Sequence, residues 1–276
     1  MTPPRLVCPA CRRADGGDLH VQLLAPVDDG VLGCACGARY PVIDGIPVVL
    51  RDLRGWLASE GHEALRRPDL PPACEALLVE GIGGAVARND TLARVYGQSQ
   101  EGPLQAWLRT RCAPLAGPLL ELGAGLGVTG RADVVAIDTN LGMLRRHAGW
   151  RVCADALDPP LLPASFDTVV IANLLDSIRD PGLALAQADA LLRPGGTLVT
   201  TCAYAFHEET VSPALRFTPE SLVEALSNER PFGGYCVRHT IVEIADRVSW
   251  PLRLSDRTVH THDVQAIISV KRAAAD

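Results

Sequence analysis

The fold of this chain depends on one stretch, Leu119-Leu120-Glu121-Leu122-Gly123-Ala124-Gly125-Leu126-Gly127. Its apolar first half is typical of a buried parallel strand, and glycines then recur at every second position. Glycine lets the backbone approach a ligand closely and adopt positive φ angles. A run of this kind also occurs in ordinary flexible turns, so the neighbouring segments must decide its meaning.

The next apolar segment strengthens the interpretation of the glycine run as a ligand-binding loop. Val134-Val135-Ala136-Ile137-Asp138 is rich in β-branched residues and ends in a carboxylate. In units of strand, glycine loop, strand and acid, that carboxylate commonly meets the two hydroxyls of a ribose. The two segments together therefore indicate a binding site for a ligand that contains a ribose.

Five motifs from this region to the C-terminus occur in the order of a known family. From about Pro103 onward the chain resembles the class I S-adenosylmethionine (SAM)-dependent methyltransferases, in the broad group that includes ubiquinone-biosynthesis-type enzymes. The motifs are Glu121–Gly127, Asp138, Cys153–Ala156, Ser165–Asn173 and Leu191–Leu198. The resemblance implies an α/β fold with a Rossmann-like, seven-stranded, mostly parallel sheet and an antiparallel last strand, and it implies SAM as the cofactor.

The resemblance also implies which residues bind SAM. Asp138 is expected at the ribose, Asp155 is expected to accept a hydrogen bond from the adenine amino group, and Ala156 is expected beside the ring. Asn173 ends the expected fourth strand, at the edge where ligands bind in open α/β sheets. The expected cofactor-binding residues are Glu121, Gly123, Ala124, Gly125, Gly127, Asp138, Thr139, Asp155, Ala156 and Asn173.

The connection between the first two expected strands is short. Only Gly123 to Asp133 joins them, whereas a parallel crossover with its helix usually needs at least about ten to twelve residues. Gly130 further weakens a helix in this segment. Either a single turn suffices, or the cofactor pocket is more open than in most relatives. A non-catalytic, SAM-binding scaffold is therefore one alternative to an enzyme.

Methyl transfer is an in-line displacement at an activated sulfonium carbon, so alignment of the two reactants comes first. A general base is needed only when the acceptor carries a proton at neutral pH. The candidate catalytic residues follow the expected fifth strand: His207 first, then Tyr204, with Glu208 and Glu209 beside them. His260 and His262 could share one face of a strand and converge on a ligand, or could belong to a polar turn.

Four cysteines near the N-terminus form two close pairs, Cys8 with Cys11 and Cys34 with Cys36. Two such pairs can bring four thiolates to one tetrahedral zinc ion. A unit of about fifty residues buries too little apolar surface to stabilise itself, so a metal is physically expected there. The alternative is four ordinary thiols in a loop-rich leader.

The residues after the second cysteine pair carry another resemblance. Tyr40-Pro-Val-Ile-Asp-Gly-Ile-Pro47, together with the cysteines, resembles the small zinc-ribbon domain known as an activating partner of tRNA and protein methyltransferases. It implies a structural zinc ion held by Cys8, Cys11, Cys34 and Cys36. The second pair here is Cys-x-Cys instead of Cys-x-x-Cys, and His20 is an alternative ligand.

We therefore expect three parts: a zinc ribbon at residues 1–54, a helical linker or lid at 55–117, and a SAM-binding methyltransferase domain at 118–276. Helical spacing is present at Ala73–Leu78, at Asn89–Tyr96 and at Leu104–Leu108, the last beside the first strand of the sheet. If the middle part is a lid, Tyr96, Gln98 and Gln100 lie near the substrate; if it is a linker, they do not.

Composition restricts the partners. The net charge of −6, with only four each of Phe, Tyr and Trp, argues against a nucleic-acid binder, which needs a basic face and aromatic stacking surfaces. No apolar stretch reaches the ~20 residues that span a bilayer, and the N-terminus has no apolar signal core. The nine cysteines are then best interpreted as thiols or metal ligands of a cytoplasmic protein.

The sequence thus predicts a SAM-dependent methyltransferase that acts on a small molecule or a peptide, with a structural or substrate-recruiting zinc ribbon. An enzyme that modifies RNA or a protein is the second alternative, because the ribbon could recruit either partner. Membrane partners are not expected, and the oligomeric state is not predicted.

Overall fold

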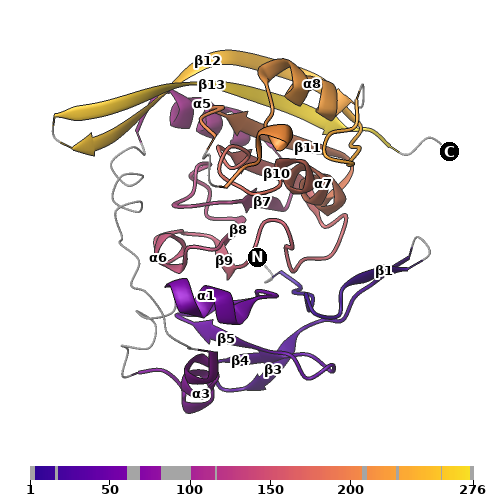
Figure 1. Ribbon diagram of the computed structural model, residues 1–276, viewed down its shortest axis with the longest axis vertical. Helices are drawn as coiled ribbons and strands as arrows, with labels where there is room; N and C mark the ends of the chain where they lie inside the picture. Colours follow the sequence, from indigo (N-terminus) through magenta and orange to yellow (C-terminus); the bar gives the residue numbers. More distant parts are fainter. Residues whose placement is uncertain are drawn as a thin grey trace.

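The computed structural model describes residues 4–15, 18–60, 69–81, 101–115, 117–206, 210–227, 230–255 and 257–273. A seven-stranded sheet forms the centre of the molecule, and two smaller sheets of two and four strands are built from N-terminal residues (Figure 1). The predicted Asn89–Tyr96 helix, Tyr96, Gln98, Gln100 and His207 lie outside the described residues.

Five strands of the central sheet are parallel and lie in the order β9-β8-β7-β10-β11. They are β7 (Leu119–Leu122), β8 (Val134–Asp138), β9 (Trp150–Cys153), β10 (Phe166–Ala172) and β11 (Leu192–Cys202). From β7 the chain first proceeds outward to β9 and then returns to the other side of β7 as β10. This reversal of direction opens a crevice at the carboxyl ends of the strands.

The last two strands are β12 (His239–Ser255) and β13 (Thr258–Lys271), and both pairings of β13, with β11 and with β12, are antiparallel. The predicted α/β fold with antiparallel final strands is confirmed. The sequence predicts this last pair of strands at Val237–Asp246 and Val264–Val270. Both strands are longer in the structure, and the hairpin extends well past the sheet (Figure 1). Its added length packs Trp250 into the same core cluster as Leu104 and Leu108 of α5 (Pro103–Cys112).

The other helices within the described residues are α1 (Leu53–Glu60), α3 (Pro72–Gly81), α6 (Leu141–Leu144), α7 (Pro181–Leu191) and α8 (Pro219–Ser227), with a 3-10 turn, η1, at Pro213–Leu215. The sequence predicts a helix start with Thr218 as N-cap and Pro219 at the first position. The structure confirms it, because the Thr218 hydroxyl accepts a hydrogen bond from the Ser221 backbone N–H at 3.2 Å. The helix expected at Leu104–Leu108 is also confirmed as α5, in one apolar cluster with Leu119 of β7.

The connection from β7 to β8 contains turns and bends but no helix, and every residue of it is described. Its glycines Gly123, Gly125, Gly127 and Gly130 have φ angles of +72°, +54°, +89° and +69°. These left-handed conformations suit glycine and replace the helical crossover that the family resemblance would suggest. The backbone therefore lies close above the ends of β7 and β8.

The N-terminal residues form β1 (Arg13–Asp15), β2 (Asp18–His20), β3 (Ala25–Asp28), β4 (Val31–Gly33), β5 (Arg39–Ile43) and β6 (Ile46–Pro47). This unit is joined to the central sheet at its β9 edge. Val48 pairs in parallel with Cys153, and the Val49 N–H donates to the Cys153 carbonyl at 2.7 Å. The N-terminal unit thus extends the central sheet by a short segment.

Side chains reinforce this junction. Arg51 pairs with Asp158 at 2.9 Å, and Arg145, which follows α6, pairs with Asp44 at 2.7 Å. The Trp56 indole N–H donates to the Thr139 carbonyl at 2.7 Å, directly after β8. The boundaries near residues 54 and 117 stay predictions, but the two predicted domains share a packed interface.

None of the helices in the described part of the chain combines the length and the apolar character that crossing a membrane would require.

Candidate cofactor-binding site and cysteine cluster

A cavity of about 520 Å³ opens at the carboxyl ends of β7, β8, β9 and β10. This volume is within the range of small-molecule sites, roughly 300–1,000 Å³. The cavity is lined by all of the cofactor-binding residues expected from the sequence except Glu121. The strand order therefore brings together residues that are spread over more than fifty positions of the sequence.

Asp138 connects the end of β8 to the glycine loop. One carboxylate oxygen accepts the Gly125 backbone N–H at 2.8 Å, and the other accepts the Asn140 backbone N–H at 2.8 Å. These two bonds orient the Asp138 carboxylate at the rim of the cavity, which it lines. Thr139, next in the chain, also lines the cavity.

Asp155 follows β9 and is held in a similar way. One carboxylate oxygen accepts the Leu157 backbone N–H at 2.8 Å, and the other pairs with Arg179 at 3.1 Å. The adjacent Ala154 and Ala156 are small and buried. The Asp155 carboxylate thus reaches the cavity between two small apolar side chains, which also line it.

Asn173 lies at the end of β10 with a φ angle of +50°, which is uncommon for a residue other than glycine. Its side-chain oxygen accepts the Thr201 hydroxyl at 2.8 Å, and its backbone N–H donates to the Thr201 carbonyl at 3.0 Å. The neighbouring strand β11 thus holds Asn173 in this conformation at the rim of the cavity. Strained backbone of this kind clusters at functional sites.

Glu121 lies beneath the glycine loop and not in the cavity wall. Its buried carboxylate accepts the Thr129 backbone N–H at 2.8 Å, the Val128 N–H at 3.3 Å and a hydrogen bond from His147 Nε2 at 3.0 Å. Burial by itself raises the pKa of Glu121, but the donors from His147 and Thr129 outweigh it, so the pKa lies below the usual 4.5. Nothing in the local sequence pattern marks His147 as a partner of Glu121.

The remaining wall of the cavity is apolar and comes from elements outside the parallel sheet. Leu104 and Leu108 of α5 line it together with Trp250 of β12, and Gln105 is a polar member of the same wall. A bidentate ion pair between Arg111 and Glu243, with N–O distances of 2.9 to 3.1 Å, fastens α5 to β12. Trp250 lies far from α5 in the sequence, and its place in the cavity wall was not predicted.

Of the two predicted catalytic residues, Tyr204 lies within the described part of the chain. Tyr204 has a φ angle of +55°, its hydroxyl donates to Gln265, and burial raises the pKa of its phenol well above 10. It lines a second, more open cavity of about 580 Å³ with Glu220 and Asp246. His207 lies outside the described residues, but Thr210, three positions later, lines the first cavity.

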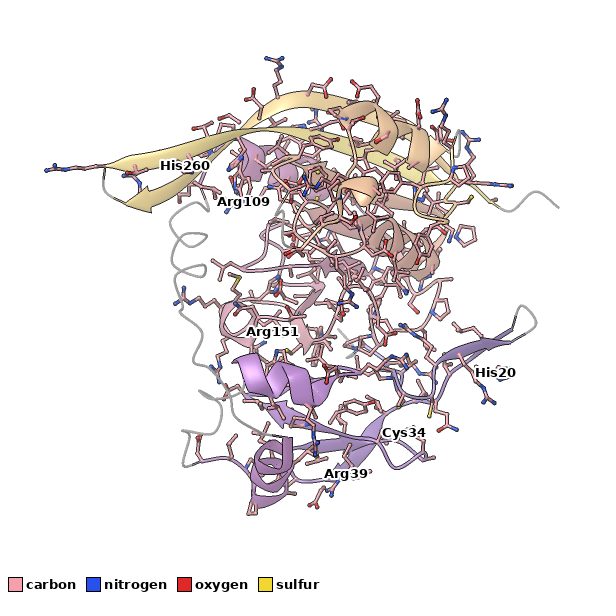
Figure 2. The ribbon with its side chains drawn as sticks, viewed as in Figure 1. His20, Cys34, Arg39, Arg109, Arg151 and His260 are labelled. Carbon is pink, nitrogen blue, oxygen red and sulfur yellow. The ribbon has the colours of Figure 1, made fainter. Side chains whose placement is uncertain are left out.

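The four N-terminal cysteines come together as the sequence predicts. Their sulfur atoms all lie within 4.8 Å of one another, with 3.8 Å between Cys8 and Cys36 and 3.6 Å between Cys11 and Cys34. Four sulfurs in a tetrahedron around zinc, at bond lengths of about 2.3 Å, lie about 3.8 Å apart, whereas a disulfide requires about 2.05 Å. The donor set therefore fits a tetrahedral metal ion. His20 is exposed on β2, apart from Cys34 (Figure 2).

Residues 117–200 match the model of a family described as a methyltransferase domain. A demethylmenaquinone methyltransferase from Renibacterium salmoninarum is 33% identical over 119 residues, which are 39% of this chain and 49% of that protein. One from Clavibacter sepedonicus is 35% identical over 155 residues, 49% of this chain and 61% of that protein. The chain thus spans about half the length of the curated relatives it matches.

Among solved structures, a SAM-dependent methyltransferase from Thermotoga maritima, described as a possible histamine N-methyltransferase, is 16% identical. The match covers 66% of this chain and 99% of that one, with a TM-score of 0.46.

The strand order, the acids after β8 and β9, the glycine loop and the family match all agree with one another. The domain match and these relatives support a class I SAM-dependent methyltransferase, with the methyltransferase domain at residues 117–200.

Proposed function

We propose that this protein transfers the methyl group of SAM to a small-molecule acceptor. The observation that carries the proposal is the cavity, because it collects the glycine loop and the acids that follow two consecutive strands. Asp138 would accept from the ribose hydroxyls, and Asp155 from the adenine amino group, with Ala156 against the ring. The glycine loop from Gly123 to Gly127 would lie along the amino-acid part of SAM.

The strand order suggests where the acceptor binds. The adenosine half of SAM would occupy the side of the cavity above β8 and β9, which leaves the other side for the reacting methyl group. On that side α5 and Trp250 pack over β7, β10 and β11, in a cluster with Leu119, Val170 and Val199. We therefore propose the α5–Trp250 wall as the surface that holds the acceptor.

The chemistry of this wall favours an uncharged acceptor. Leu104, Leu108 and Trp250 offer apolar contact, and Gln105 offers an amide. The curated relatives are named as demethylmenaquinone methyltransferases, so a hydroquinone ring is the first acceptor to test. The wall would align the acceptor with the methyl group and exclude water, and such alignment supplies a large share of the rate enhancement. His207 remains the predicted general base for an acceptor that carries a proton.

Calorimetric titration with SAM and with its demethylated product, S-adenosylhomocysteine, tests the cofactor site. Asp138→Ala is expected to weaken both affinities at least about tenfold, since it removes a charged hydrogen-bond acceptor for the ribose. Asp133→Ala, just before the start of β8, is the matched control and is expected to bind like the wild type. Asp133 pairs with Arg131 outside the cavity. Equal affinity in the wild type and Asp138→Ala would contradict the proposed site.

Transfer of a labelled methyl group from SAM tests the acceptor class. A hydroquinone, a peptide mixture and an RNA are offered to the wild type under the same conditions. Label in the hydroquinone supports the proposal. Label only in peptide or RNA would overturn the small-molecule class, and SAM binding without transfer to any acceptor would favour a scaffold.

We further propose that Cys8, Cys11, Cys34 and Cys36 hold a structural zinc ion. Support comes from the sulfur–sulfur distances, which match a tetrahedral site, and from the small size of the N-terminal sheets. No step of methyl transfer involves this site, which lies in the N-terminal unit and not in the cavity.

A further inference from the structure

The connection from β7 to β8 lacks a helix, so something else must fix the glycine loop in place. Asp138 holds it at one point, through the Gly125 N–H. The second half of the loop, where Val128 and Thr129 lie, is held by the buried carboxylate of Glu121. A single carboxylate thus anchors the part of the loop that a helix would otherwise anchor.

His147 in turn holds that carboxylate. Its Nε2 lies 3.0 Å from the Glu121 carboxylate, and its Nδ1 accepts the Gly149 backbone N–H at 3.0 Å. Because Nδ1 accepts, the hydrogen-bond network assigns the proton of the neutral ring to Nε2, which donates to Glu121. The imidazole therefore has a definite tautomer and orientation.

The ring also touches the glycine loop directly. A Cβ atom added to Gly127 would lie 2.8 Å from both Cδ2 and Nε2 of His147, too close for any real side chain. The edge of the imidazole is thus the surface on which the loop backbone rests at Gly127. His147 itself does not line the cavity and would act on the cofactor only through Glu121 and the loop.

We infer that His147 is a positioning residue for the cofactor site: it orients Glu121 and supports Gly127, so that the glycine loop keeps its binding conformation without a helix. The inference rests on the proposed function, because it names what shapes the same site.

The experiment compares His147→Leu and His147→Gln with the wild type by calorimetry with SAM and by hydrogen exchange of the loop amides. The leucine removes the donor to Glu121, and the glutamine side chain can still donate. We expect His147→Leu to weaken SAM binding at least about tenfold and to lower the protection of the Val128 and Thr129 amides. His147→Gln is expected to recover most of both properties.

His239→Leu is the matched control for a merely structural role. His239 is also fully buried and also hydrogen-bonded to a carboxylate, with Nε2 3.0 Å from Asp189, but it lies between β12 and α7, away from the cavity. We expect this variant to lose stability, with unchanged SAM affinity and unchanged protection of the loop amides.

The inference is overturned if His147→Leu and His239→Leu behave alike in both measurements. A wild type that binds neither SAM nor its product would instead contradict the proposed function. In that case the hydrogen exchange of Val128 and Thr129 still decides the role of His147, since it needs no ligand.

Discussion

Two glycines of the loop have the same unusual backbone conformation but different surroundings. Gly127 has a φ angle of +89° and lies against His147, whereas Gly130 has a φ angle of +69° and its nearest neighbour, Arg109, would lie 3.6 Å from an added Cβ. Substitution at either position introduces left-handed strain of roughly 1–2 kcal/mol. At Gly127 alone, a steric clash with a buried ring is added.

We therefore predict that Gly127→Ala lowers the free energy of unfolding by more than Gly130→Ala does. Gly127→Ala should also weaken SAM binding, because the loop must move away from His147. Denaturant unfolding and calorimetric titration of the two variants measure both effects. If the two variants lose equal free energy of unfolding, backbone strain alone accounts for the loss, and the clash with His147 contributes nothing.

Glu121 gives a pH dependence that can be measured. Its pKa in the folded protein lies below 4.5, so its contribution to stability is present above about pH 4.5 and is lost as the pH falls through the folded-state pKa. Glu121→Gln lacks this contribution. We predict that the variant is less stable than the wild type at pH 7 and that the gap narrows below about pH 4.5. Denaturant unfolding at a series of pH values checks this, and a gap that stays constant down to pH 3 would contradict it.

At the scale of residues, the sequence was sufficient to predict which positions at strand ends line the cavity, while their role in binding SAM stays a prediction. Asp138, Asp155 and Asn173 each end an apolar run, and parallel strands bring such ends to one edge of the sheet. His147 and Trp250 were missed for a physical reason. Each reaches the site through tertiary packing, from a turn and from the far part of a hairpin, and neither position has a local signature.

Among the helices and strands, too, some features were predictable from the sequence and others were not. The start of α8 was predictable because Thr218 and Pro219 are a local capping signal. The length of the hairpin of β12 and β13 was underestimated, because apolar partners of its outer half come from α5, which is distant in the sequence. In the structure, Trp250 of that half lies in one apolar cluster with Leu104 and Leu108 of α5.

The attachment of α5 to β12 allows a prediction about specificity. Glu243→Gln weakens the bidentate pair with Arg111, whose side chain is 42% exposed, so we expect little change in melting temperature. We expect the KM for the acceptor to rise and SAM affinity to stay the same, because α5 forms only the acceptor wall. Asp167→Asn, which weakens a similarly exposed pair with Arg193, is the control and should change neither. A loss of SAM affinity in Glu243→Gln would contradict the assignment of this wall.

At the scale of the whole molecule, the N-terminal unit and the central sheet share their core. Leu6, Cys8, Tyr40 and Val49 lie in one buried cluster with Val152 and Ala154 of the β9 edge. The sequence predicted both parts and the cysteine cluster, but it gave no sign of this interface. The residues that form the interface are apolar, and in the sequence they cannot be told apart from the core residues of each part.

We predict that removal of a metal ion from the cysteine cluster destabilises the entire molecule. A strong chelator should lower the melting temperature by on the order of 10 °C within a single transition, since loss of the N-terminal fold exposes the shared core. Calorimetry and metal analysis measure this. Cys236→Ser, which changes an exposed cysteine outside the cluster, should respond to the chelator like the wild type, whereas Cys8→Ser should have a low melting temperature before treatment. Two separate transitions, with the upper one unmoved, would contradict a shared core.

The junction at the β9 edge also bears on the order of events during synthesis. The N-terminal unit leaves the ribosome before the central sheet, and its partners come much later: Asp44 pairs with Arg145 across 101 positions and Arg12 with Asp158 across 146. Closing loops of this length is slow compared with forming local hairpins. The apolar residues of the N-terminal unit that pack on the β9 edge therefore stay exposed to solvent until β9 has been synthesised. A metal ion bound early would hold the ribbon folded through that interval, so metal supply during translation would affect the yield of folded protein.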